Sequence, residues 1–230
     1  MNQITEKQLA AEYAANYIED GMAVGLGTGS TVAFLLNKLS QRIKGGLQIT
    51  AVSSSSLTTK SATALGIKIL KLSEVDEIDL TIDGADEVDE NLNGIKGGGG
   101  ALLFEKIIAS YSRKNIWIVD SGKLVKTLGR FPLPVEVVKF GSEHLFKLFE
   151  QTGYNPKFRD KGPGRFITDN GNYIIDLSIN EIDNPEEFDI RLKKYPGIVE
   201  TGLFYNVADV VVAGEGNSIK EINKKKREQT

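Results

Sequence analysis

The sequence predicts an α/β fold, in which a Rossmann-like parallel sheet is flanked by helices and a smaller α+β domain is inserted. Two patterns lead to this prediction. Short apolar runs alternate with helical stripes through the first half of the chain, which is typical of parallel strands joined by helices. All six prolines then fall between residues 132 and 196. We therefore expect a Rossmann-like main domain from residues 1–130 plus 206–230, and a smaller α+β domain from residues 131–205.

The individual elements follow from the spacing of apolar residues. Leu9, Tyr13 and Tyr17 recur at helical intervals, whereas residues 22–26 form a short apolar run. In the first half, these criteria predict helices at residues 4–18, 31–43, 57–65 and 101–112, and strands at 22–26, 47–52, 67–70, 78–82 and 115–119. In the second half they predict helices at 142–150 and 185–192 and strands at 172–177 and 208–213, the last rejoining the parallel sheet.

Composition and charge argue against several classes of function. The formal net charge is −3, so no basic field would recruit nucleic acid or a membrane surface. The chain has no cysteine and one histidine, His144, which argues against thiolate chemistry, a metal cluster and a histidine relay. No segment resembles a signal peptide or a membrane span, so we expect a soluble cytoplasmic protein. We interpret the basic run at residues 224–227 as a solvated helix end or a frayed tail.

The segment GLGTGST, residues 25–31, lies between a predicted strand and a predicted helix. Its glycines allow the backbone to approach a ligand, and free amides at a helix N-terminus favour an anion. Ser30 stands where the dinucleotide fingerprint requires a third glycine, and no Walker lysine follows, so neither nucleotide motif fits. Two interpretations are equally favoured: a site for a small phosphomonoester, or a turn in which Ser30 or Thr31 caps the helix.

Carboxylates gather directly after the predicted strand at residues 78–82. Asp83 and Asp86 flank a tight turn that could aim both at one ligand and so accept and return hydroxyl protons. A magnesium site is a further option, although Lys96 nearby would oppose a cation. We interpret the remaining acidic residues of this segment as a solvated turn: Glu87, Asp89 and Glu90.

Four consecutive glycines, residues 97–100, precede a strong predicted helix that carries Glu105. A flexible linker is the simplest interpretation of such a run, but its position favours amides arranged around an anionic oxygen. Leu102, Ile108 and Ala109 share the flank of Glu105. The carboxylate should therefore face a partly apolar wall, where desolvation makes it a stronger base. The alternative is a surface glutamate at a helix start.

Other polar residues are interpreted, from spacing alone, as structural or solvent-exposed. The serine run at residues 53–56 again lies between a strand and a helix, and for each of its serines a capped loop is favoured. Lys106 is interpreted as a surface residue of its helix. Lys123 follows the strand at 115–119 and is interpreted as a surface lysine, although it would lie within reach of the same crevice.

Together these segments resemble the type A family of ribose-5-phosphate isomerases, nearly from end to end. The matching segments occur in the family's order: GLGTGST, VSSSS, DGADEVD, KGGGGALLFEKI, VDSGKLVKTLG, FPLPVEV, TDNGN and PGIVETGLF. The resemblance implies interconversion of ribose 5-phosphate and ribulose 5-phosphate in the pentose phosphate pathway, with no metal and no organic cofactor. It also implies a homodimer or dimer of dimers, for which the smaller domain is a reasonable place for subunit contacts.

The resemblance also assigns roles to individual residues. Glu105 matches the family's proton-transferring base, which moves a proton from C2 to C1 through a cis-enediolate, and Asp83 and Lys96 assist it. Lys123 matches a substrate-contacting lysine, in contrast to the interpretation from spacing, and Lys7 aligns with a phosphate contact. The three substrate-binding loops match Thr28, Gly29, Ser30 and Thr31; then Asp83, Gly84, Ala85 and Asp86; and finally Lys96, Gly97, Gly98 and Gly99.

Two other classes of function compete with this interpretation. A non-catalytic sugar-phosphate sensor would bind ribose 5-phosphate without converting it. The first predicted strand begins about twenty residues into the chain, which leaves no space for a DNA-reading module, and the acidic balance argues against DNA contact. A nucleotide-binding Rossmann protein is disfavoured by Ser30 in place of the last fingerprint glycine.

Overall fold

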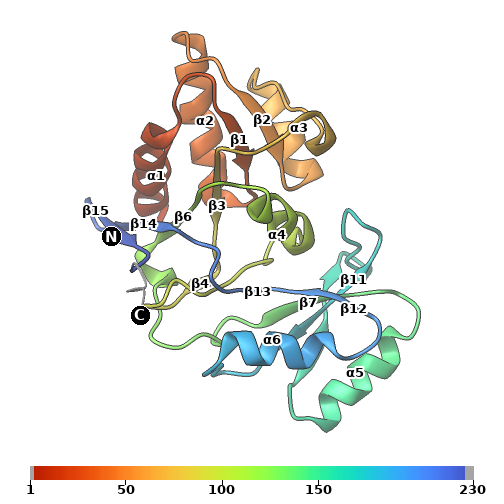
Figure 1. Ribbon diagram of the computed structural model, residues 1–230. Coiled ribbons are helices and arrows are strands. Elements are labelled where there is room, and N and C mark those ends of the chain that lie inside the picture. Colours follow the sequence, from red (N-terminus) through yellow and green to blue (C-terminus); the bar gives the residue numbers. More distant parts are fainter. Residues whose placement is uncertain (1–2, 226–230) are drawn as a thin grey trace.

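The computed structural model describes residues 3–225, and its main layer is a six-stranded sheet (Figure 1). The strand order is β15-β14-β6-β3-β1-β2. The strands from β14 to β2 are parallel, whereas β15 pairs antiparallel with β14. The predicted α/β class with a central parallel sheet is therefore confirmed, and β15 is an additional edge strand. The bounds are β1 (Ala23–Leu26), β2 (Thr50–Ser53), β3 (Leu80–Gly84), β6 (Asn115–Asp120), β14 (Val210–Glu215) and β15 (Ser218–Asn223).

Both faces of this sheet are buried, because successive side chains of its strands alternate between two hydrophobic clusters. Ile116 and Val212 pack with three helices, α1 (Gln3–Ala14), α2 (Ser30–Lys44) and α3 (Ser56–Ala64). Their neighbours Trp117 and Val211 point to the opposite face, on which α4 (Leu102–Ser110) also lies. Three short 3-10 helices complete this part: η1 (Ala15–Tyr17), η2 (Leu72–Glu74) and η3 (Ser121–Lys123).

A second lobe, at the bottom of Figure 1, has its own antiparallel sheet and its own core. The strand order is β12-β7-β11-β8, with bounds β7 (Leu133–Val137), β8 (Pro156–Phe158), β11 (Tyr173–Leu177) and β12 (Ile198–Thr201). Two helices pack with it, α5 (Ser142–Gln151) and α6 (Pro185–Lys193). Ile95 and Leu128 also join this core from outside residues 131–205. The domain boundaries stay a prediction.

Two small sheets complete the architecture. β4 (Glu87–Val88), β5 (Gly94–Ile95) and β13 (Leu203–Phe204) pair antiparallel, so the segment after β3 is joined to the segment after β12. β9 (Asp160–Lys161) and β10 (Gly164–Arg165) form a hairpin of the second lobe. The three-stranded sheet therefore ties the acidic turn after β3 to the second lobe.

Some predicted elements differ from the observed ones. Residues 67–70 do not form a strand, because Ile69 touches the sheet at one bridge, to Ala51, and the chain then leaves the edge. The strand predicted at 47–52 begins only at Thr50. Lys224 and Lys225 are exposed and follow β15, so a helix end is wrong for them, while Lys226 and Arg227 lie outside the described residues. Within residues 3–225, no helix has the length and apolar character that crossing a membrane requires.

The contact between β14 and α1 gives a stability prediction. A methyl group on Gly214 would lie 2.0 Å from the backbone oxygen of Glu6, so Gly214→Ala must displace helix α1. Overpacking of this kind typically lowers the free energy of unfolding by about 1–3 kcal/mol. Gly164→Ala is the matched control, because a methyl group there meets nothing within 4 Å. Urea denaturation measures the free energy of unfolding of both variants, and equal values for the two would contradict the packing described.

Candidate active site

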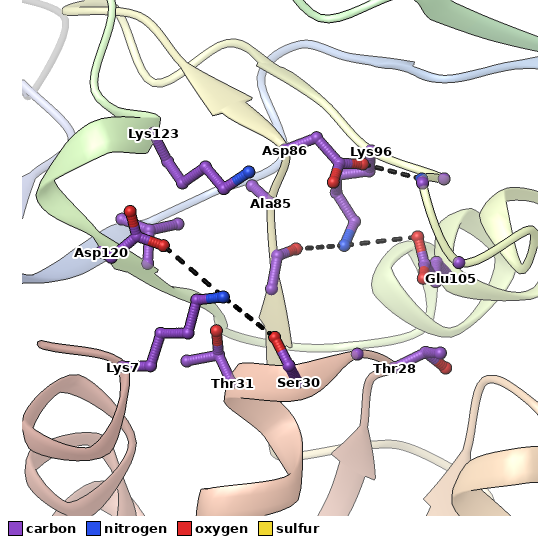
Figure 2. Close-up of a pocket in the computed structure, with 16 residues that line it drawn as sticks. Lys7, Thr28, Ser30, Thr31, Ala85, Asp86, Lys96, Glu105, Asp120 and Lys123 are labelled. Atoms are coloured by element: carbon purple, nitrogen blue, oxygen red, sulfur yellow. Dashed lines mark hydrogen bonds and ion pairs between the residues drawn. The ribbon is translucent and has the colours of Figure 1, made fainter. Parts of the chain in front are cut away.

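A pocket opens at the carboxyl ends of β1, β3 and β6 (Figure 2). Parallel sheets commonly bind ligands at this edge, where loops from several strands converge. Every residue of the three predicted loops lines the pocket except Asp83, and Glu105 and Lys123 line it as well. Lys7, Val119 and Asp120 complete the lining. The structure therefore brings the three expected loops together at one pocket, with Asp83 behind them, and adds Val119 and Asp120, which were not expected there.

The first loop forms the N-terminal end of helix α2. Gly29 is the N-cap residue, with a φ of 114° that favours glycine, and no side chain caps the helix. Capping by Ser30 or Thr31, one of the two interpretations of this segment, is therefore wrong. The first turn of α2 carries no acidic residue, so its free amides and dipole are available to an anion. Lys7 adds a positive charge there and donates a hydrogen bond to the Ser30 Oγ, at 3.1 Å.

Thr28 faces away from this anion site. Its hydroxyl lies within hydrogen-bond distance of Ser54 at 2.9 Å, Ser55 at 2.8 Å and Thr58 at 3.2 Å. Ser55 is also the N-cap of α3 and accepts a hydrogen bond from the Thr58 amide. The predicted structural role of the serine run is therefore confirmed for Ser55, and this hydroxyl cluster fixes the position of the first loop.

Asp83 lies behind the pocket wall. It is 3% exposed, and its Oδ1 accepts hydrogen bonds from the amides of Thr28, at 3.0 Å, and Gly84, at 2.7 Å. Its Oδ2 lies 2.8 Å from the ammonium group of Lys96. Asp83 thus holds two loops together and pairs with Lys96 instead of facing the cavity.

A buried ion-pair group of Asp83, Lys96 and Glu105 forms the floor of the site. Lys96 is 3% exposed, and its Nζ donates to the Gly84 carbonyl at 2.5 Å and lies 3.4 Å from the Glu105 Oε2. Glu105 is 5% exposed, and this Oε2 has no hydrogen-bond partner. Figure 2 shows the Lys96 ammonium directed at the Glu105 carboxylate. The prediction that Glu105 is buried beside an apolar flank is confirmed, and a surface position is wrong.

Burial changes the proton affinity of this group. The pKa of Glu105 is raised to about 8. Desolvation is the largest cause; the charge of Lys96 opposes it in part, and the charges of Asp83 and Asp86 add to it. Desolvation by itself would lower the pKa of Lys96, but the negative charges of Asp83 and Glu105 outweigh it and raise that pKa. Lys96 therefore stays charged while Glu105 can gain and lose a proton near neutral pH.

The glycine run is an ordered wall of the pocket. Gly97 and Gly100 have positive φ angles of 103° and 81°, and a methyl group on Gly97 would lie 2.9 Å from Leu102. The Gly98 amide donates to the Asp86 Oδ2 at 2.7 Å. The interpretation as a flexible linker is therefore wrong, because packing and a carboxylate fix the backbone.

Positive charge gathers at the other end of the pocket. Lys123 lies in η3 and lines the pocket, so its interpretation as a plain surface residue is wrong. Asp120, the last residue of β6, is 2% exposed, and its Oδ2 has no hydrogen-bond partner and lies 4.0 Å from the Lys7 Nζ. Glu6 docks the start of α1 by accepting hydrogen bonds from Ser121 and from the Gly216 amide. Lys7 is thereby placed beside Ser30.

Two residues interpreted as solvent-exposed are buried or half-buried. Glu87 is 1% exposed and accepts hydrogen bonds from the amides of Gly129 and Phe131, both at 2.8 Å. Lys106 donates to the Glu200 carboxylate and to two backbone oxygens of the segment around β12 and β13. Both interpretations are wrong because segments distant in the sequence cover these side chains. Glu90 is exposed, as expected for a solvated turn.

The fold and the pocket define an α/β protein in which a buried carboxylate of raised pKa shares one pocket with a helix N-terminus and three lysines. Residues 50–218 match the family model described as ribose 5-phosphate isomerase A, or phosphoriboisomerase A. The chain belongs to this family, which confirms the resemblance inferred from its motifs. Among the described residues, no group of three histidine, aspartate or glutamate side chains is arranged to hold a metal ion.

Individual relatives agree with this assignment. The chain is 54% identical to ribose-5-phosphate isomerase A of Streptococcus uberis over 91% of this chain and 93% of the relative. It is 52% identical to the protein of that name from Streptococcus gordonii over 95% and 98% of the two chains. A solved D-ribose-5-phosphate isomerase in complex with phospho-erythronic acid superimposes with a TM-score of 0.92, at 39% identity, over 97% and 100%. The solved ribose 5-phosphate isomerase A of Methanocaldococcus jannaschii superimposes with a TM-score of 0.89, at 37% identity, over 95% of this chain and 98% of that structure.

The environment of Glu105 predicts its titration. Isotope-edited infrared spectroscopy, with Glu105→Gln subtracted, should show the carboxyl losing its proton near pH 8, well above the ordinary glutamate value of 4.5. Since Lys96 lowers this pKa, Lys96→Met should move the transition to still higher pH. A transition near pH 4.5 in the wild-type protein would contradict the buried environment.

Proposed function

We propose that this protein is an aldose-ketose isomerase that interconverts ribose 5-phosphate and ribulose 5-phosphate in the pentose phosphate pathway. Family membership supports the reaction. The observation that carries the mechanism is the position of Glu105, a buried carboxylate beside Lys96, in the same pocket as an anion site. A phosphorylated sugar needs both features, because one end carries the charge and the other end exchanges the proton.

The phosphate group binds at the positive end of the pocket. The amides and hydroxyls of Ser30 and Thr31 at the start of α2 hold its oxygens, and the lysines Lys7 and Lys123 balance its charge. Gly29 allows the close approach that this binding requires. The phosphate thereby directs the first two carbons of the sugar toward Glu105.

Glu105 carries the proton. It removes the proton from C2 of the open-chain aldose and returns it to C1, so the substrate passes through a cis-enediolate. Its raised pKa makes the carboxylate a stronger base, close to the optimum for transfer at neutral pH. No metal or organic cofactor takes part in this scheme, because a proton and an electron pair move within one molecule.

Negative charge that develops on the sugar oxygens is balanced by Lys96 and by the amide of Gly99, while the Gly98 amide holds Asp86. Asp86 binds the substrate from the opposite wall. Asp83 acts through Lys96, because it holds the ammonium group in place and keeps it charged. Lys96 and Lys123 assist ring opening and the passage of the hydroxyl proton between O2 and O1 as hydrogen-bond donors, with Asp83 as the positioning residue.

Glu105→Gln tests the base directly. Positioned proton transfer typically contributes a factor of about 10² to 10⁴, so kcat for ribulose 5-phosphate formation should fall at least that far. Substrate binding should persist, because the phosphate contacts remain. Glu90→Gln is the control, since Glu90 is exposed and lies outside the pocket. Near-normal turnover of Glu105→Gln, or loss of wild-type activity in chelator, would contradict the mechanism.

The alternative of a non-catalytic sugar-phosphate sensor is not supported, because the reported relatives are named as isomerases. The turnover assay separates the two functions, since a sensor would bind ribose 5-phosphate and leave it unchanged. The metabolic role of the relatives favours a cytoplasmic location.

We also propose a homodimer or dimer of dimers with contacts through the second lobe. Phe140 supports this assignment, because it is 94% exposed beside other apolar residues of that lobe, among them Val138 and Leu148. Phe140→Asp should lower the mass measured by light scattering, whereas Leu57→Asp, at a 65% exposed site on α3, should not. A wild-type monomer would contradict the proposal.

A further inference from the structure

An arginine of the second lobe contacts the glycine loop of the active site. Arg159, directly after β8, extends to the loop, and its Nη1 donates to the carbonyl oxygens of Gly97, at 2.6 Å, and Gly98, at 3.1 Å. Arg159 does not line the pocket and matches none of the predicted site residues. Its contacts therefore need an explanation outside direct substrate binding.

Asp176 holds the guanidinium group in a fixed orientation. Its two carboxylate oxygens accept hydrogen bonds from Nε, at 3.0 Å, and from Nη2, at 2.5 Å. Asp176 lies on β11, an interior strand of the second-lobe sheet. A bidentate pair on an interior strand is a rigid support, because both the planar group and its partner have defined positions.

Fixing these carbonyls also fixes the amides. In a trans peptide the C=O and N–H groups point in opposite directions, so a Gly97 carbonyl held by Arg159 turns the Gly98 N–H the other way. That N–H donates to Asp86 on the pocket wall. The Gly98 carbonyl sets the Gly99 N–H in the same manner, and both glycines line the pocket.

Phe166, at the other end of the β9–β10 hairpin that Arg159 precedes, holds the end of the glycine loop. A methyl group on Gly100 would lie 2.4 Å from the ring of Phe166, so the ring packs directly on the backbone. The Phe166 amide in turn donates to the Arg159 carbonyl at 2.7 Å. Glycine runs lose much conformational freedom on ordering, and these contacts from outside the loop supply the order that glycine side chains cannot.

We propose that Arg159, anchored by Asp176, is a positioning residue that holds the glycine loop with the Gly98 amide on Asp86 and the Gly99 amide toward the oxygen on which charge develops. This inference rests on the proposed isomerase function. A preorganised donor acts mainly in the transition state, and loss of one such donor typically lowers kcat by about 10²- to 10³-fold. Because Arg159 acts through the backbone, its removal should lower kcat roughly 10- to 100-fold and leave KM within about threefold.

The experiment compares Arg159→Met and Arg159→Lys with the matched control Arg165→Met. Arg165 belongs to the same lobe, but its guanidinium group stacks on Phe158 and pairs with Glu143 without touching the glycine loop. Asp176→Asn is the second test, since it leaves Arg159 in place and weakens its support. Thermal melting establishes that each variant is folded. The assay follows kcat and KM for ribose 5-phosphate, and inhibition by phospho-erythronic acid and by inorganic phosphate.

The carboxylate of phospho-erythronic acid places negative charge where the enediolate would carry it. We expect Arg159→Met to lower kcat and to weaken this inhibitor at least tenfold, with inhibition by inorganic phosphate unchanged. Arg159→Lys should restore part of the activity, because lysine can donate to a carbonyl but cannot pair with Asp176 in two places. Asp176→Asn should lower kcat to a smaller extent, and Arg165→Met should match the wild type.

Three outcomes would overturn the inference. These are unchanged kcat in folded Arg159→Met, equal weakening of both inhibitors, and an equal loss of kcat in Arg165→Met. An inactive wild-type protein would instead contradict the proposed function, and the inference with it.

Discussion

The buried group of Asp83, Lys96 and Glu105 is the constraint on which the rest of the site depends. A lysine that is 3% exposed must be paired, because an isolated charge in a protein interior is strongly unfavourable. Lys96 has one close carboxylate partner, Asp83 at 2.8 Å, and a longer contact to Glu105 at 3.4 Å. The Glu105 Oε2 thus has no hydrogen-bond partner, and burial raises the pKa of this carboxyl because the longer contact to Lys96 offsets the desolvation only in part. One ion pair therefore both stabilises the floor of the pocket and keeps a base available.

The fold brings these groups together from separate elements. Asp83 lies on β3 of the parallel sheet, Lys96 follows β5 of the small sheet, and Glu105 lies in the first turn of α4. The second lobe closes the assembly through Lys106, which binds the segment around β12, and through Arg159 on the glycine loop. Charge is then separated along the pocket, with the α2 N-terminus and two lysines at one end and the acid–base group at the other.

Local sequence predicted most of the site, because most of it lies in short loops after strands. The burial of Glu105 followed from its apolar helix flank, whereas the three substrate loops were assigned through the resemblance of their motifs to the family. Residues whose partners are distant in the sequence were predicted poorly. Glu87 and Lys106 were interpreted as solvent-exposed, and no local pattern pointed to Arg159. Asp120 could have been found, since it ends β6 at the sheet edge just as Asp83 lies near the end of β3. The strand predicted at residues 67–70 was wrong, because an apolar run does not reveal whether a sheet edge lies near enough for the segment to pair with it.

A crystal structure of Glu105→Gln with ribose 5-phosphate bound would test the central claim most directly. The account predicts the phosphate group at Ser30 and Thr31 with Lys7 alongside, and the C1–C2 end within hydrogen-bond distance of the residue 105 side chain. Lys96 should remain on Asp83. A sugar bound in the reverse direction, or a carbonyl end that faces solvent far from residue 105, would contradict the account.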